Sequence, residues 1–272
     1  MSVAVVGHVE WVEFVRVERL PQQGEILQAG ETWAEAAGGG GVAAVQLARL
    51  AGESTLYCAL GDDAIGHRAK AELEALGVRV EAAWRPAPQR RGITFLDARH
   101  ERTIVVIGEK HHPRRDDPLD WDALATAEAV YLTAGEPDAI QAARRAGVLV
   151  STARELPILQ RAGVELDALV ASGEDAGERY APGDLDPPPR LVVTTSGALG
   201  GWMQPGGPYA AAPLPGPVED AYGAGDSFAA GLTYGLGRGW PADEAVALAA
   251  RLGAEALTRR GAHGGGPATG PP

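Results

Sequence analysis

Cysteine is almost absent from this chain, since Cys58 is the one thiol among 272 residues. A single cysteine excludes an intrachain disulfide framework, which is typical of proteins kept in a reducing compartment. Uninterrupted apolar runs of about 20 residues, the length of a membrane span, are also missing. The first residues have neither a basic segment nor a long apolar core, so no signal peptide is predicted. We therefore expect a cytoplasmic protein without membrane contact.

Basic residues are also fewer than acidic residues. The chain has 24 Lys and Arg against 36 Asp and Glu, for a formal net charge of -12. Such a surface repels a phosphate backbone, so sequence-independent binding of nucleic acid is excluded. The length suffices for one large α/β core, and we find no internal repeat and no long linker. We expect a single domain over residues 1–264 and a flexible Gly/Pro-rich tail at 265–272.

The second half of the chain alternates short apolar runs with helical patterns. Expected strands are Val3–Val6, Ala129–Leu132, Val148–Val150, Ala168–Val170 and Leu191–Thr195, with helices at Glu136–Ala146 and Ala242–Arg259. This βαβ rhythm predicts a mostly parallel sheet with helices on both faces, and ligands at the carboxyl ends of its strands. Partly exposed strands are expected near residues 9–17 and 26–35, the latter as a strand pair, and in a hairpin over 91–107.

The most informative stretch runs from Asp220 to Asp226. Between these carboxylates lie the small residues Gly223, Ala224 and Gly225, and a helix is expected over 227–236. Backbone N–H groups at a helix start lack intrahelical partners, and the helix dipole favours an anion there. Asp226 could accept a proton from a hydroxyl beside that anion, which is the equipment for phosphoryl transfer to an alcohol. The alternative is that Asp226 only caps the helix.

This motif resembles the C-terminal signature of the ribokinase-like (PfkB) carbohydrate kinases, Asp-Thr-x-Gly-Ala-Gly-Asp, with Ala221 in place of Thr. Two further stretches are similar to that family. Residues 38–50 with 61–66 resemble its N-terminal signature, and 192–201 its nucleotide segment. The glycines at 38–41 are expected to precede a helix over 42–51. The resemblance implies a three-layer α/β/α sandwich with a central mostly parallel sheet. It also implies a small β lid from about residues 9–35 and 90–107.

The resemblance further implies a role for each matching residue. Asp226 would be the general base, with amides of Gly223, Ala224 and Gly225 as the anion hole. ATP contacts would come from Thr195, Gly197, Gly200, Asp220 and His263. The acceptor would meet Gly38, Gly39, Gly40 and Gly41, together with Glu10 and Arg91. Ser172 and Asp175 would help hold Mg²⁺ through water, although Ser172 could equally cap a helix.

Departures from the family pattern leave the acceptor open. Val42 stands where the family usually has a sugar-binding Asn, Val12 where it usually has an Asp, and Ala250 where an Asn is expected near adenine. A sugar hydroxyl facing valine would lose a hydrogen bond worth about 1 kcal/mol. The acceptor would then have fewer hydroxyls, or be bound by Glu10, Glu13 or the arginines at 90 and 91. We expect an ATP-dependent kinase of a small sugar or sugar-like molecule. The alternatives are a nucleoside or vitamin-like alcohol as acceptor, or a non-catalytic nucleotide- or metabolite-binding regulator, against which Asp226 argues.

Two further expectations come from the resemblance alone. Family members often bind K⁺ near the turn that matches Asp220, so potassium is a candidate ion beside ATP and Mg²⁺. A homodimer through the lid is a candidate assembly, because such dimers are common in the family. Trp11, Phe14 and Trp33 are then either lid contacts or core residues. The adjacent His111 and His112 are not favoured as a metal site, because neighbouring loop residues chelate poorly without further ligands.

Overall fold

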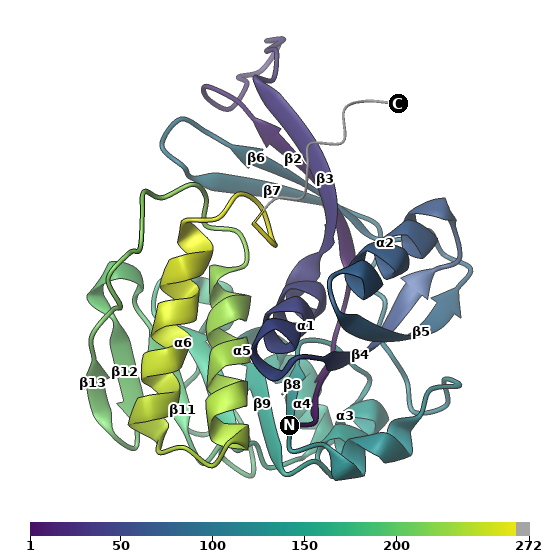
Figure 1. Ribbon diagram of the computed structural model, residues 1–272, viewed down its shortest axis with the longest axis vertical. Helices are drawn as coiled ribbons and strands as arrows, with labels where there is room; N and C mark the ends of the chain where they lie inside the picture. Colours follow the sequence, from purple (N-terminus) through teal and green to yellow (C-terminus); the bar gives the residue numbers. More distant parts are fainter. Residues whose placement is uncertain (265–272) are drawn as a thin grey trace.

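The computed structural model describes residues 1–264; the predicted flexible tail, 265–272, lies outside the described residues. A nine-stranded sheet forms the centre, and a four-stranded sheet projects from one end of it (Figure 1). In spatial order the large sheet contains β13 (Gly207–Tyr209), β12 (Gly201–Gln204), β11 (Val192–Thr195), β10 (Ala168–Ser172), β9 (Val148–Thr152), β8 (Ala129–Leu132), β1 (Val3–Val6), β4 (Ser54–Gly61) and β5 (Val78–Arg85). All neighbours are parallel except at β12 and β13, which are antiparallel.

Helices cover both faces of this sheet. One face carries α1 (Gly38–Ala51), α2 (Ala64–Ala75), α5 (Ala224–Gly237) and α6 (Ala242–Leu257). The other carries η1 (Trp121–Thr126), α3 (Pro137–Ala143) and α4 (Leu156–Ala162), and the short turns η2 (Ala153–Glu155), η3 (Ala176–Glu178) and η4 (Gly197–Leu199) lie in loops. The predicted α/β/α sandwich with a mostly parallel sheet is confirmed.

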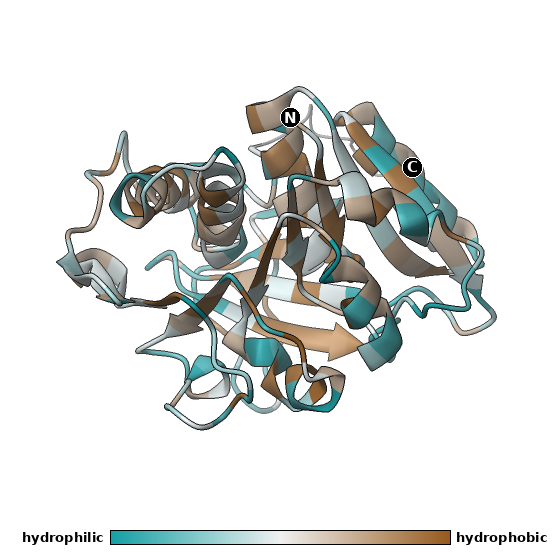
Figure 2. Cartoon of the chain, turned by 90° about the horizontal axis from the view of Figure 1, so that it is seen from below, coloured by the Kyte–Doolittle hydropathy of each residue, from teal (hydrophilic) through white to brown (hydrophobic). Residues whose placement is uncertain are grey.

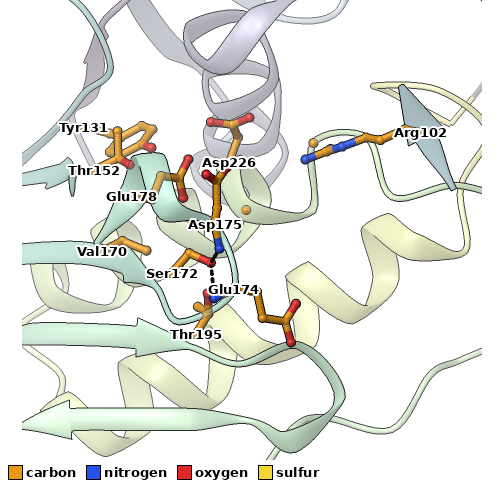
Figure 3. A pocket seen from close by; sticks show the side chains of 12 residues that line it. Arg102, Tyr131, Thr152, Val170, Ser172, Glu174, Asp175, Glu178, Thr195 and Asp226 are labelled. Atoms are coloured by element: carbon orange, nitrogen blue, oxygen red, sulfur yellow. Dashed lines mark hydrogen bonds between the residues drawn. The ribbon is translucent and has the colours of Figure 1, made fainter. Parts of the chain in front are cut away.

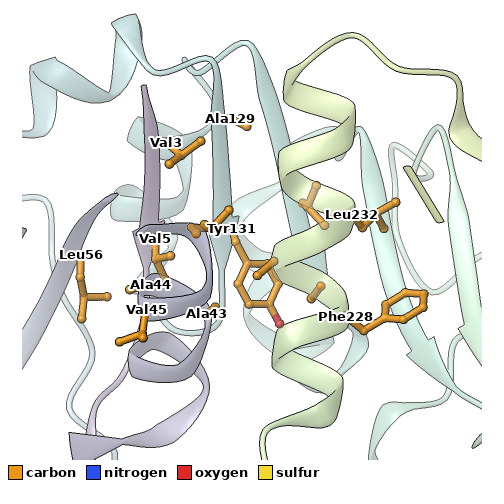
Figure 4. Packing of buried hydrophobic residues seen from close by; sticks show 14 of the residues in the cluster. Val3, Val5, Ala43, Ala44, Val45, Leu56, Ala129, Tyr131, Phe228 and Leu232 are labelled. Atoms are coloured by element: carbon orange, nitrogen blue, oxygen red, sulfur yellow. The ribbon is translucent and has the colours of Figure 1, made fainter. Parts of the chain in front are cut away.

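The side chains of the central strands alternate between the two faces of the sheet, which explains why helices pack on both faces. In β1, Val3 and Val5 belong to the apolar cluster under α1 and α5, while Ala4 and Val6 belong to the cluster under α3 and α4. Successive side chains of a strand point to opposite faces, so a fully apolar strand is suited to burial between helices. Tyr131 of β8 lies between α1 and α5 in the first cluster (Figure 4).

Hydrophobic residues concentrate on the central strands, whereas the outer loops are mostly hydrophilic (Figure 2). Burial of these strands supplies the main driving force for folding. Within residues 1–264, none of the helices combines the length and the apolar character needed to cross a bilayer.

The small sheet is the lid expected from the sequence. Its spatial order is β3 (Glu31–Ala37), β2 (Glu10–Arg16), β6 (Arg91–Leu96) and β7 (Arg102–Ile107), with β2 and β6 parallel. The predicted strand pair at 26–35 was wrong, because this segment supplies only β3. The face of the lid that turns toward the body packs Val12, Phe14 and Leu96 against Val42 and Tyr222.

Candidate active site

The turn before α5 forms as its glycine pattern predicts. Gly223 caps the helix with φ 74, a left-handed conformation that residues with a side chain rarely adopt. The first hydrogen bond of the helix joins the Ser227 amide to the Gly223 carbonyl, at 2.8 Å. The amides of 224–226 precede that bond and therefore stand at the positive end of the helix dipole. A Cβ on Gly223 would lie 2.9 Å from Val42, so Val42 supports the turn from below.

Asp220 holds this turn to the rest of the protein. Its carboxylate is fully buried and accepts the backbone amides of Tyr222 and Gly261, both at 2.8 Å. Burial raises the pKa of Asp220, while these two hydrogen bonds and Arg16 and Arg102 favour its charged form. The side chain thus links the helix start to the loop after α6. Potassium near this residue stays a prediction from the resemblance.

A pocket of about 410 Å³ opens beside Asp226, at the carboxyl ends of β8 to β11 (Figure 3). It is lined by Arg102, Tyr131, Thr152, Val170, Ser172, Glu174, Asp175, Glu178, Thr195, Gly223, Gly225 and Asp226. Six residues selected from the sequence, at 172, 175, 195, 223, 225 and 226, therefore meet in one place. Ala224 lies in the same helical turn as its two lining neighbours.

Asp226 is half-buried where this pocket meets the start of α1. Burial raises its pKa to about 6, with a further contribution from the nearby charge of Glu178, whereas Arg102 and Arg154 act in the opposite direction. A carboxylate with that pKa is ionised at neutral pH and is a better proton acceptor than an ordinary aspartate. The group is therefore suited to act as a general base.

The loop after β10 is organised by side chains within it. The Ser172 hydroxyl accepts the amides of Glu174 and Asp175, at 3.2 and 3.1 Å, as a helix cap would. Asp175 accepts the Gly177 amide and pairs with Arg154 at 2.6 Å, which lowers its pKa. No group of three or more potential metal ligands occurs in residues 1–264. Magnesium here would depend largely on nucleotide phosphates, as it commonly does.

The start of α1 faces Asp226. The four glycines do not precede the helix, as the sequence suggested, but form its first turn. A Cβ on Gly39 would lie 2.8 Å from an Asp226 carboxylate oxygen, and one on Gly40 would lie 2.6 Å from the His8 carbonyl. Small residues are required here because two helix starts and the loop after β1 converge. The Tyr222 hydroxyl accepts the Gly38 amide at 3.2 Å and joins the two turns.

Polar side chains from several segments surround this turn. His8 accepts the Gly39 amide at 3.3 Å and contacts Thr133 at 3.4 Å. The Lys110 ammonium donates to the Thr133 carbonyl at 3.0 Å and to Glu155 at 2.5 Å. On the lid side, Arg90 donates to Glu10 at 2.6 Å. We call His8, Glu10, Arg90, Lys110, Thr133 and Glu155 the His8 cluster.

Burial, followed by the charges of Lys110 and Arg90, holds the pKa of His8 well below its usual value. The imidazole is therefore neutral at pH 7, and it stands in a positive potential. His8, Lys110, Thr133 and Glu155 were not found from the sequence, because the cluster is assembled from five separate segments. Only the folded sheet brings the ends of β1 and β8 together with the lid.

Two sequence-selected residues make other contacts than expected. The His263 ring is buried and contacts the Ala36 carbonyl at 2.7 Å, and burial lowers its pKa to about 4. Arg91 pairs with Glu13, so the arginine beside Glu10 is Arg90 instead.

Among the nucleotide-segment glycines, Gly200 is required by the β12–β13 hairpin, since its Cβ would meet the Tyr209 carbonyl at 2.1 Å. Gly197 remains next to the pocket, where a Cβ would lie 3.0 Å from the lining residue Glu174.

The two valines that replace family sugar ligands also have a structural explanation. Val12 and Val42 are buried in one small apolar cluster with Phe14 and Tyr222. They join the lid to the turn before α5.

Comparisons with known proteins agree with this geometry. A family model described as pfkB family carbohydrate kinase matches residues 1–155 and 165–268. An ATP-dependent ribose-1-phosphate kinase from Halopiger xanaduensis is 31% identical over 282 aligned positions, which cover 94% of this chain and 92% of that protein.

Solved structures establish the fold. Ribokinase from Thermotoga maritima superimposes with a TM-score of 0.78 at 19% identity, covering 98% of this chain and 96% of that one. Adenosine kinase from Sinorhizobium meliloti gives a TM-score of 0.76 at 19% identity, with 96% and 95% covered. Together with the family match, these findings show that this chain belongs to the pfkB family of carbohydrate kinases and catalyses ATP-dependent phosphorylation of an alcohol group on a sugar or sugar-like molecule.

Proposed function

We propose that Asp226 is the general base of this kinase and that the amides of 223–226 form its anion hole. The observation that carries this proposal is the position of Asp226 between the pocket and the first turn of α1. The acceptor would lie on the Gly39 side and the nucleotide on the Thr195 side. Asp226 would then stand between the hydroxyl and the terminal phosphate of ATP.

In the proposed step, Asp226 takes the proton of the acceptor hydroxyl, and the oxygen of that hydroxyl bonds to the γ-phosphorus. The bond from that phosphorus to the β–γ bridging oxygen breaks, and ADP leaves. Charge on the transferred phosphoryl group is stabilised by the amides at the start of α5. Mg²⁺ bound to the nucleotide would neutralise further phosphate charge, with Asp175 and Ser172 near enough to orient its water ligands.

We further propose that the acceptor is a small sugar that already carries a phosphate. The Halopiger xanaduensis relative is a kinase of ribose-1-phosphate. The His8 cluster supplies two cations near Gly39, Lys110 and Arg90. Each is paired with a carboxylate, Glu155 and Glu10 respectively, and each still has N–H donors for a further acceptor. Arg90 uses Nε on Glu10, and a guanidinium has four further N–H groups. A phosphate is recognised well by such a pair of cations.

Initial rates over an acceptor panel would test this proposal. Ribose, ribose-1-phosphate, ribose-5-phosphate and adenosine are compared at fixed Mg-ATP, with ADP formation as the readout. We expect kcat/KM for ribose-1-phosphate to exceed that for ribose by about 100-fold, as charge-assisted contacts predict. Ribose-5-phosphate has the same charge and controls for geometry. Equal kcat/KM values for ribose and its phosphates would contradict a phosphorylated acceptor.

A matched pair of variants would locate the phosphate contact. Lys110→Met removes a cation from the His8 cluster, whereas Lys70→Met removes the other lysine of the chain, which pairs with Glu74 on α2. The first should raise KM for a phosphorylated acceptor about tenfold or more, and the second should leave it unchanged. Equal effects of both changes would argue against the assignment.

A further inference from the structure

The carboxylate of Asp226 lies beside the first turn of α1, yet it accepts no hydrogen bond from any part of residues 1–264. A carboxylate at a helix start is commonly capped by backbone amides, because the first N–H groups of the helix lack intrahelical partners. Hydrogen bonds of that kind favour the charged form and so make the carboxylate a weaker base. The amides at the start of α1 must therefore have acceptors other than Asp226.

The acceptors of these amides are two side chains and one carbonyl. The Gly38 amide donates to the Tyr222 hydroxyl at 3.2 Å. The Gly39 amide donates to Nε2 of His8 at 3.3 Å, and the Gly40 amide donates to the His8 carbonyl at 3.0 Å. A Cβ on Gly39 would lie 3.3 Å from Cε1 of His8, so the imidazole lies against the same backbone. His8 thus satisfies two of the three amides, one of them through its ring.

The orientation of the His8 ring is fixed at its second nitrogen. Nδ1 lies 3.4 Å from the Thr133 hydroxyl. Because Nε2 accepts the Gly39 amide, the ring proton belongs on Nδ1 and points to Thr133. Acceptance by Nε2 requires a neutral ring. Burial, together with the charges of Lys110 and Arg90, holds the pKa of His8 well below 6.5 and meets that requirement.

Charged groups from several elements face His8 and Asp226. They come from the lid, from the loop after β7 and from the short turns η2 and η3: Glu10, Arg90, Arg102, Lys110, His112, Arg154 and Glu178. For both side chains, burial has a larger influence on the pKa than any of these charges. Glu10 is the carboxylate nearest the ring, with Oε1 3.9 Å from Nε2, and it is already paired with Arg90 at 2.6 Å. Asp226 is therefore the carboxylate beside Gly39 that remains open to a donor.

We propose that His8 is a positioning residue of this kinase, which holds the Gly39 amide away from Asp226 and so leaves that carboxylate free to take the proton of the acceptor. The proposal rests on Asp226 as the general base, and it adds a residue that lies outside the sequence motifs. No bond to His8 forms or breaks in the step. If Asp226 accepted the Gly39 amide, one of its oxygens would be engaged and it would bind a proton less strongly. His8 thus preserves base strength at a helix start, where the dipole and the amides otherwise weaken it.

Two substitutions separate the acceptor at Nε2 from the bulk of the ring. His8→Phe keeps a ring and removes the acceptor, so the Gly39 amide needs a new one, and Asp226 lies beside it. His8→Gln offers a carbonyl oxygen near the position of Nε2 and should restore the behaviour of wild type. His67→Phe is the matched control, because His67 is an exposed histidine of α2 that pairs with Asp62. His8→Leu replaces His8→Phe if the latter does not melt cooperatively.

The pH profile of kcat/KM, measured with the acceptor that the panel identifies, gives the kinetic readout. In His8→Phe the acid limb should move down by about one pH unit, because a hydrogen bond to the carboxylate favours its charged form. The plateau above pH 7 should fall about tenfold, since the base is weaker. His8→Gln and His67→Phe should keep the acid limb of wild type. A lower plateau with an unmoved acid limb in His8→Phe would reduce His8 to a structural role and overturn the proposal.

NMR of the Asp226 carboxyl provides a readout that needs no turnover. Carbon-13 labelling of aspartate makes the carboxyl signals visible, and Asp226→Asn identifies the signal of interest. Its titration midpoint should lie near pH 6 in wild type, in line with the raised pKa, and about one unit lower in His8→Phe. Melting temperature and Mg-ADP affinity close to wild type would show that the variant is folded. An identical midpoint in wild type and folded His8→Phe would overturn the proposal.

The assignment of the base and the assignment of His8 fail in different ways. If Asp226→Asn keeps the kcat of wild type while the NMR midpoint moves in His8→Phe, the base is another group, and the effect of His8 on the Asp226 carboxyl stands. If Asp226→Asn is inactive and the midpoint does not move in His8→Phe, the His8 assignment fails alone.

Discussion

At the scale of single residues, Asp226 is a carboxylate in a site where burial disfavours its charged form. Burial raises its pKa to about 6, against 3.8 for an exposed aspartate. The acid form cannot accept a proton from the acceptor. Activity should therefore rise with pH through about 6 and level off above it, because deprotonation creates the base.

The pH profile of kcat/KM for the acceptor, measured between pH 5 and 8, checks this expectation. Wild type should lose activity tenfold per unit of pH below about 6. Asp226→Asn should lower kcat about 100-fold or more and abolish this acid limb, while nucleotide binding persists. Asp122→Asn, at an exposed aspartate on η1, serves as the control. An acid limb that survives in Asp226→Asn would assign the titration to another group.

The same substitution should stabilise the fold. With the native pKa of Asp226 raised, the native state holds a proton between about pH 4 and 6 that the unfolded chain releases. Stability from this group is therefore present at low pH and is lost as pH rises through the native pKa. Asp226→Asn should gain on the order of 1–2 kcal/mol in unfolding free energy at pH 7 and little at pH 4. Urea titrations at both pH values provide the measurement.

Sequence reasoning found Asp226 but not Arg102 or His8, and the reason is physical. A base and its glycine turn occupy one short segment, so local spacing reveals them. Arg102 meets Ala221 through a contact between the lid and the body, and His8 meets Gly39 across the sheet. Neither contact leaves a local pattern. His263 was placed near adenine because its segment matched, yet its ring turns inward to Ala36.

At the scale of elements, the five central strands expected from the sequence were confirmed, whereas the start of α1 was not predicted. The run Ala129–Leu132 became β8 without change, because four apolar residues between turns have little alternative. The glycines at 38–41 read as a loop because glycine disfavours helix by about 1 kcal/mol per residue. They form the first turn of α1 nevertheless. Larger residues would collide with His8 and Asp226, which explains why these positions are glycine. Long-range packing thus decided the boundary.

Two glycines of this run test that explanation. Gly39→Ala places a methyl 2.8 Å from an Asp226 oxygen, so the carboxylate must shift. We expect kcat/KM to fall about 10- to 100-fold, since displacement of a base by 1 Å is costly. Gly41→Ala is the matched control, because its methyl would meet Leu73 at an ordinary 3.6 Å. It should keep activity and gain stability. Steady-state rates and melting curves distinguish the two, and similar activities would contradict a packing role for Gly39.

At the scale of the whole molecule, the lid has an uncovered edge. β7 is the last strand of the lid sheet, and the four residues from Ile104 to Ile107 are between 41% and 50% exposed. The aromatic residues expected to contact a second chain are not available. Trp11 and Phe14 are buried, and Trp33 stacks on Phe14 and on Arg260. These aromatic side chains pack the inner face of the lid against the body of the same chain.

We still predict a homodimer, now with the exposed residues Ile104–Ile107 of β7 as the contact in place of the three aromatic residues. Exposed apolar edge strands tend to pair with another strand. We expect sedimentation analysis to find a dimer of the 28.2 kDa chain, and Val105→Lys with Ile107→Lys to shift it to monomer. Arg99→Ala on the same hairpin should leave the assembly unchanged. A wild-type chain that sediments as a monomer at tens of micromolar would rule this prediction out.

The meeting of the first turns of α1 and α5 also has a consequence during biosynthesis. α1 is made early, whereas α5 and α6 are made last and cover the apolar face of strands synthesised well before them. While it grows, the nascent polypeptide exposes that face and has no carboxylate beside Gly39. Such an exposed apolar surface makes a partly synthesised chain prone to aggregate. A product truncated before α5 lacks Asp226, so we expect it to have no kinase activity.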